Sequence, residues 1–309
     1  MFFLKEFRIL LLTFSILTLS TIGFFFFVKT TPIQDFNTLN ISQITNDEKK
    51  LEEVLTKIGI KKAMEKLIEE SKGGSEFDCH QQAHQIGRIG YKIYKEIAFA
   101  ESSAACHSGA YHGAMETFLA EVGTQDLALK VDAICKLFDT SFGIFECLHG
   151  VGHGILAYLD YDLPQALETC QLLKTDFDKS SCYGGVFMEN IVSAQGQGAD
   201  PAHKTEWAND DLQFPCNKID QDNNIQYQCS QMQTSWMLTL TSHDFDKVGQ
   251  ECLKVPKEMI PVCFKSFGRD AAGFTLREPA EIVNLCEKVP KKQDFYDQCI
   301  TGAVNVIVD

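Results

Sequence analysis

The sequence predicts an all-α fold of disulfide-stapled helical-hairpin repeats, an α-solenoid-like array behind an N-terminal transmembrane helix. Two features carry this prediction: twelve cysteines, most of which recur at regular spacing, and an uncharged run of twenty residues near the N-terminus. The 309 residues are 45% hydrophobic and 23% charged, which is the composition of a folded protein and not of a disordered one.

Five cysteines open repeated segments, and each has a second cysteine 11 to 13 residues upstream. The openers are Cys147, Cys182, Cys229, Cys263 and Cys299, and their partners upstream are Cys135, Cys170, Cys216, Cys252 and Cys286. An apolar residue stands four positions before each upstream cysteine, which is the step of a helix face. We therefore expect a unit of two helices, with one cysteine late in the first helix and one at the start of the second. A period near 35 residues is the size of such a unit in helical solenoids.

These cysteines could bind metal or form disulfides. The last six keep the same spacing with no histidine beside them, so one role shared by all copies is simpler, namely a disulfide within each unit. Cys79 and Cys106 remain and are expected to pair with each other. Each such bridge stabilises the fold by about 3 kcal/mol in the chain-entropy model. The plan of one cysteine pair per two-helix unit resembles that of disulfide-stapled TPR-like repeat proteins, but their consensus residues are absent, so no function carries over.

The N-terminal residues 1–29 are predicted to form a signal anchor. Residues 9–28 carry no charge and are long enough to cross a bilayer, while Lys5 and Arg8 precede them. The positive-inside rule then places the rest of the chain outside the cytoplasm, in the periplasm or the extracellular space. A cleaved signal peptide is the competing interpretation. Either one suits disulfides, which persist in oxidising compartments.

Three further segments complete the chain. Residues 30–50 are polar and are predicted to form a tether, and residues 51–75 predict a leading amphipathic helix that ends at a Gly-Gly pair. Residues 76–309 form the repeat domain with its six cysteine pairs. One interval between openers is longer than the others because residues 194–215 are inserted there. Long loops in arrays often lie on the working face, but a solvated excursion explains this insertion equally well.

Several function classes are excluded or unsupported. A net charge of −14 argues against a nucleic-acid partner, which needs a basic face. The sequence contains no C-x-x-C-H haem motif, no nucleotide-binding loop and no H-E-x-x-H zinc motif. The segment Asp220–Asn224 imitates the start of a calcium loop but lacks its turn glycine and its final glutamate.

Histidine is the one sign of chemistry. Six of the eight histidines follow a cysteine within six residues, and all lie in the N-terminal half of the repeat domain. They are His80, His84, His107, His112, His149 and His153, and Glu116 and Glu189 fall on the same predicted helix faces. Stacked repeats would bring these side chains into a row. Imidazole with carboxylate suits zinc, iron or copper.

Other roles for these histidines stay open, because they could fix the packing of repeats, respond to pH or line a pocket for an organic ligand. The sequence therefore supports two functions. The first is a membrane-anchored, extracytoplasmic protein with a multi-histidine transition-metal site, either a metalloenzyme or a metal carrier. The second is a non-catalytic scaffold that binds a peptide or a partner protein on its repeat face. His203 and His243 lie outside the cluster and are expected to be ordinary surface residues.

Overall fold

The computed structural model describes residues 39–71, 79–103, 105–106, 108–196, 204–219, 222–290 and 293–308. The chain divides into two units, Met1–Asn40 and Ile41–Asp309, and every described helix belongs to the second. The predicted anchor and residues 30–38 of the predicted tether lie outside the described residues, whereas the rest of the tether, residues 39–50, contains helical turns that the sequence did not predict. Among the residues that are described, no helix has both the length and the apolar character needed to cross a membrane.

The described part of the chain is helical and contains no strand. In order, the elements are α2 (Ile41–Ile44), α3 (Glu48–Ser71), α4 (His80–Tyr94), α5 (Ile97–Glu101), α6 (Gly109–Val122), α7 (Leu127–Cys135), α8 (Ser141–Tyr158), α9 (Leu163–Cys170), α10 (Asp176–Ala194), α11 (Asn223–Leu240), α12 (Phe245–Glu251), the 3₁₀ turn η2 (Lys257–Met259), α13 (Ile260–Phe274), α14 (Pro279–Cys286) and α15 (Gln293–Val308). The all-α prediction is confirmed for these residues.

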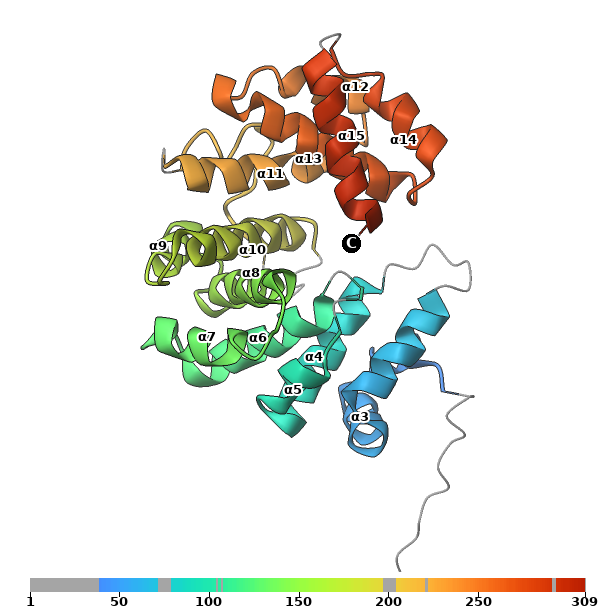
Figure 1. The fold of residues 1–309 in the computed structure, drawn as a ribbon, viewed down its shortest axis with the longest axis vertical. Coiled ribbons are helices and arrows are strands. Elements are labelled where there is room, and N and C mark those ends of the chain that lie inside the picture. The colour runs from blue at the N-terminus through green and yellow to red at the C-terminus, as the bar shows by residue number, and fades with distance from the viewer. Residues whose placement is uncertain are drawn as a thin grey trace, which may run out of the picture. The chain divides into compact units, whose positions relative to one another are not determined.

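The long helices contact one another in chain order. From α4 the contacts run through α6, α8, α10, α11 and α13 to α15 (Figure 1). The short helices α7, α9, α12 and α14 each pack against the long helix that follows. Side chains far apart in sequence therefore meet wherever equivalent faces of successive long helices touch. Whether the units form a solenoid-like array stays a prediction.

Six disulfides join the cysteines, and they are the six expected pairs, five from the spacing and Cys79–Cys106 as the remaining pair: Cys79–Cys106, Cys135–Cys147, Cys170–Cys182, Cys216–Cys229, Cys252–Cys263 and Cys286–Cys299. No described cysteine is free. Three upstream cysteines are the last residue of a short helix, which each disulfide ties to the next long helix.

The second cysteine of a unit differs from expectation, because it does not start its helix. Cys147 and Cys182 each lie six residues after the first residue of their helices. Capping residues explain this, since Thr140 and Thr175 accept hydrogen bonds from backbone N–H groups of the first turn and so begin the helices earlier. In α10, Thr175 and Asp178 form a complete capping box.

The leading helix also differs in detail. α3 begins at Glu48, ends at Ser71 and is broken at Gly59, whose φ of 80° lies in the region that favours glycine. Its buried face includes Leu51, Leu55 and Leu67. Expecting one continuous helix over residues 51–75 was therefore wrong at the glycine, where the helical backbone is interrupted.

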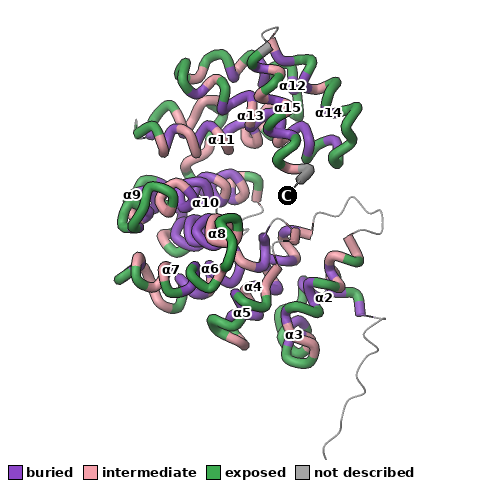
Figure 2. Tube along the Cα trace, in the orientation of Figure 1, coloured by how far each residue is buried: buried purple, intermediate pink, exposed green. Residues whose placement is uncertain are grey.

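Glycine lets the central helices approach closely. A Cβ on Gly152 of α8 would collide with the carbonyl oxygen of Cys182 in α10, and one on Gly185 with the carbonyl of His149. On the other side, Gly113 of α6 faces the carbonyl of His84 in α4 in the same way. Figure 2 shows α8 and α10 as largely buried. This close approach puts the side chains next to these glycines at the interior of the helix stack.

Candidate metal centre

Five histidines and two glutamates from four consecutive long helices meet in the interior. His80 and His84 come from α4, His112 and Glu116 from α6, His149 and His153 from α8, and Glu189 from α10. All seven are buried, and His153 has no exposed surface. His107 lies outside the described residues, as does His203. His243 is exposed and stacks on Phe274, away from this His–Glu centre.

Helix geometry explains the assembly. Residues four apart share one helix face, so α4, α6 and α8 each present two of these side chains one turn apart. The imidazoles of neighbouring helices then touch: the ring centroids of His112 and His153 are 4.4 Å apart and stacked, and those of His84 and His112 are 5.4 Å apart. Within α4, the rings of His80 and His84 are 4.6 Å apart.

If both rings are neutral, the contacts of His80 and His84 cannot all be hydrogen bonds. His80 Nδ1 lies 2.9 Å from the carbonyl oxygen of Cys106, so Nδ1 must carry the proton and Nε2 a lone pair. That Nε2 lies 3.1 Å from His84 Nε2. If His84 donates from Nε2, its Nδ1 presents a lone pair to the carboxylate of Glu116 at 2.9 Å. If it donates from Nδ1, two nitrogen lone pairs face each other.

A positive charge resolves this conflict, either as an extra proton on His80 or on His84 or as a metal ion between the two rings. The proton fits poorly at His84, because Nδ1 and Glu116 Oε1 are close but neither atom completes a hydrogen bond of acceptable angle. Burial, the largest influence, lowers the pKa of His84 to about 3 in spite of the charge of Glu116. Two nitrogens 3.1 Å apart would instead bind one zinc-like ion at an angle of roughly 100°, given Zn–N bonds of about 2.0–2.1 Å.

Glu116 is ionised and paired. Burial alone would raise the pKa of its carboxyl, but the guanidinium of Arg88 and the contact with His84 outweigh burial and hold the pKa below the ordinary value. Arg88 Nε donates to Glu116 Oε2 at 2.6 Å. The other oxygen, Oε1, is buried without a hydrogen-bond partner. It is therefore a candidate metal ligand.

His153 has the arrangement typical of a metal-binding imidazole. Its Nδ1 lies 2.9 Å from Glu189 Oε2, and Tyr161 donates its hydroxyl to Glu189 Oε1 at 3.1 Å. The carboxylate thereby fixes the Nδ1–H tautomer, which leaves Nε2 unprotonated, buried and without a hydrogen-bond partner. A buried acceptor left in this state costs about 1–3 kcal/mol.

His149 adds another donor. Its Nε2 lies 3.5 Å from the sulfur of Met188, and its Nδ1 is buried without a hydrogen-bond partner. Burial, reinforced by neighbouring histidines, lowers the pKa of both His149 and His153 well below the ordinary value. Both rings are therefore neutral near pH 7, and neutral imidazole is the form that binds metals.

Three sets of ligand atoms lie close enough together to hold an ion, each set within 4.8 Å. The first set is His80, His84 and His112, the second His112, His149 and His153, and the third Glu116, His153 and Glu189. The structure therefore brings together seven of the eight residues that the sequence nominates. Nitrogen donors dominate, which suits zinc, iron or copper better than calcium or magnesium.

The sequence alone did not identify three contributors. Arg88 lies one helical turn after His84 and could have been found from that spacing. Tyr161 sits in the turn after α8 with a φ of 62°, and nothing in its sequence context signals that it returns to Glu189. A third residue, Glu146, places a carboxylate oxygen 3.8 Å from His112 Nε2.

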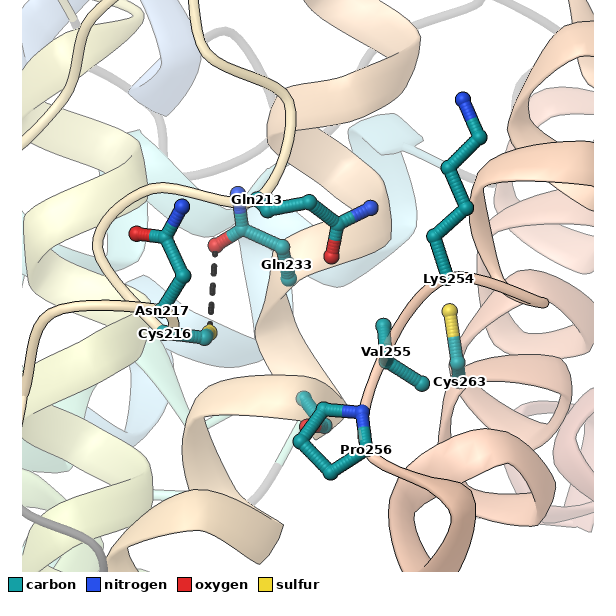
Figure 3. A pocket seen from close by; sticks show the side chains of 9 residues that line it. Gln213, Cys216, Asn217, Gln233, Lys254, Val255, Pro256 and Cys263 are labelled. Carbon is teal, nitrogen blue, oxygen red and sulfur yellow. Dashed lines mark hydrogen bonds between the residues drawn. The ribbon is translucent and has the colours of Figure 1, made fainter.

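A hollow on the described surface lies elsewhere. It has a volume of about 530 Å³ and is lined by residues around α11 and the start of α13, among them Gln213, Gln233 and Lys254 (Figure 3). Gln233 Oε1 points at the sulfur of Cys216, which is disulfide-bonded and has no proton to donate. No residue of the His–Glu centre lines this hollow, so the chemistry and the surface opening are separate features.

Comparison with known proteins gives no outside guide to this centre. No protein-family model matches the chain, and no curated protein or solved structure matches it either. The function must therefore be argued from the residues alone.

Proposed function

We propose that this chain binds a transition-metal ion in the His–Glu centre and works outside the cytoplasm, attached to the membrane by its N-terminal segment. The observation that carries the proposal is the contact of His84 with His80 and Glu116. Neutral rings leave two lone pairs facing each other there, and a cation removes this repulsion. The six disulfides support an oxidising compartment. The anchor rests on the sequence alone.

Burial favours a resident metal over a transported one. Every ligand of the centre is at most 9% exposed, with His80 the most exposed. A carrier must release its metal to a partner, which needs an accessible site, whereas a resident metal is held by oriented ligands and surrounding hydrogen bonds. Cys106, Glu189 and Tyr161 supply such bonds here. We therefore favour a metalloprotein whose ion serves electron transfer or chemistry on very small molecules.

Elemental analysis of the untagged full-length protein, purified in detergent without chelator, tests this. We expect zinc, iron or copper at a fixed ratio to protein, retained through dialysis. His153→Ala should lower the ratio while helical circular dichroism stays near that of the wild type. His243→Ala is the matched control and should change neither.

The scaffold function predicts the opposite pattern. Protein that takes up no transition metal under any of these conditions, yet loses helicity when His153 is replaced, would show that the imidazoles serve packing. The repeat face would then become the site to study.

A further inference from the structure

We infer that the His–Glu centre holds two metal ions, one at each end of the cluster. The first position is the all-nitrogen set of His80, His84 and His112, and the second is the carboxylate-rich set of Glu116, His153 and Glu189. This inference rests on the proposed metal-binding function and extends it.

The reach of a single ion supports two positions. Zinc binds imidazole nitrogen at about 2.0–2.1 Å, so two ligands of one ion lie at most roughly 4 Å apart. The two end sets share no residue, and among the described residues no set of four or more ligand atoms lies mutually within 4.8 Å. One ion bound by His80 and His84 would therefore leave the Glu189 end without a cation.

Charge supports the same division. The first set contributes three imidazoles and no carboxylate, while the second contributes two buried carboxylates against the single charge of Arg88. With both carboxylates ionised and His153 neutral, that end has a net charge of about −1, and buried charge requires a counter-charge. A cation bound beside His153 supplies it.

Glu116 connects the two positions. Its Oε1 lies 2.9 Å from His84 Nδ1 on one side, and the residue belongs to the set with His153 and Glu189 on the other. Between the ends, His149 Nδ1 and His153 Nε2 are buried nitrogens without hydrogen-bond partners. They supply further ligands for the second ion. The contact between His84 and Glu116 thus links the two positions, and two metal ions held close together can activate a water molecule.

Counting metal per chain tests the inference. In the untagged full-length wild type, with protein measured by amino-acid analysis, we expect a ratio of two. His80→Ala removes a ligand of the first position, and Glu189→Gln removes the buried negative charge beside His153 at the second, so each should lower the ratio to one. Glutamine at position 189 keeps the shape of the side chain and an oxygen that accepts from His153. His243→Ala should leave the ratio at two.

A second measurement needs no variant. Cobalt(II) added to chelator-treated wild type should bind in two equivalents, with visible absorption from both. Saturation at one equivalent and a wild-type ratio of one would overturn the second position while leaving the proposed function intact. A ratio of zero with no cobalt uptake would overturn the proposed function itself.

Discussion

The region from α4 to α10 and the region from α11 to α15 are held together by the same kinds of contact, but their buried polar side chains differ. Both have disulfides from short to long helices, and both have glycines at close helix contacts, such as Gly152 in the first and Gly268 in the second. Six positions after Cys106 and Cys147 in the first region stand His112 and His153, whereas six positions after Cys229 and Cys263 in the second stand Ser235 and Arg269. Positions at the same distance from a cysteine thus have different side chains in the two regions, although the surrounding helices and disulfides are similar.

In the second region, Arg269, Asp270 and Ser235 form hydrogen bonds with one another. Arg269 donates to Asp270 at 2.6 Å and to the backbone oxygen of Gln231 at 2.6 Å, and Ser235 donates to Asp270 at 3.0 Å. In the His–Glu centre, by contrast, four buried atoms outside His112 find no hydrogen-bond partner: His84 Nδ1, Glu116 Oε1, His149 Nδ1 and His153 Nε2. The comparison supports the proposed cation in the first region, where the buried atoms without partners gather in one cluster, whereas the second region has one such atom among its described residues, Gln231 Oε1.

Reduction of the disulfides should have the largest effect, because both regions depend on them. Each bridge closes a loop of 11 to 27 residues and stabilises the fold by about 3 kcal/mol, while a whole domain has only about 5–15 kcal/mol of net stability. We expect the thermal midpoint to collapse on reduction. An unchanged melting curve, with free thiols verified, would contradict a stapling role.

Acid should come next, and it should act on the first region. In metal-free protein the folded-state pKa of His84 is about 3, against 6.5 for an unperturbed histidine. The unfolded chain therefore binds protons that the folded chain cannot, so stability is full above pH 6.5 and falls as the pH drops toward 3. His149 and His153 act in the same direction.

Each such histidine adds a slope of about 1.4 kcal/mol per pH unit, which denaturant titrations between pH 7 and 4 can measure. Protons also compete with metal for imidazole, so bound metal should be released over the same range. A stability profile that is flat from pH 7 to 4 would show that these rings are not held neutral.

Glycine replacement separates the two regions. A Cβ at residue 152 collides with the carbonyl of Cys182, and one at residue 268 with the carbonyl of Cys299. We expect Gly152→Ala and Gly268→Ala each to cost about 1–3 kcal/mol of stability. Only Gly152→Ala should also lower metal content, because α8 carries His149 and His153. Gly273→Ala is the control, since nothing lies within 4 Å of its added carbon.

The last comparison is between alanine substitutions at two equivalent positions, Arg269 and His153. Arg269→Ala should cost about 1–3 kcal/mol by leaving Asp270 without its cation, with metal content unchanged. His153→Ala should lower metal content and also cost stability in metal-free protein, because it removes the donor to Glu189 and leaves a buried cavity. Denaturant titration and elemental analysis of both variants give the comparison. Equal loss of metal from both would mean that general loosening, and not ligand loss, is responsible.

The sequence was informative about the scaffold because cysteine spacing reports covalent pairing directly. The spacing of Cys135 to Cys147 and its repetitions predicted five disulfides, and the sixth, Cys79–Cys106, followed because those two cysteines remained. Helix starts were less predictable, since Thr140 and Thr175 cap their helices ahead of the cysteines. The break at Gly59 also went unseen, because the apolar spacing continues across it.

For the His–Glu centre, residue type and helical spacing predicted which residues are ligands, but they did not predict which ligands contact each other. That His84 faces both His80 and Glu116 depends on how closely α4 and α6 approach, which Gly113 sets from the neighbouring helix. The return of Tyr161 to Glu189 depends on a left-handed turn that no local motif marks. Such details follow from tertiary packing and not from spacing along one helix.

Hydrogen exchange with and without metal tests the central claim most directly. If the His–Glu centre needs a cation, removing metal by chelation should speed amide exchange in α4, α6, α8 and α10, while α11 to α15 keep their protection. Mass spectrometry of peptides from the full-length protein resolves the two regions in one experiment. Restoring zinc, iron or copper should restore protection in the first region alone. Identical exchange in all helices before and after chelation, in protein verified to bind metal beforehand, would contradict the account.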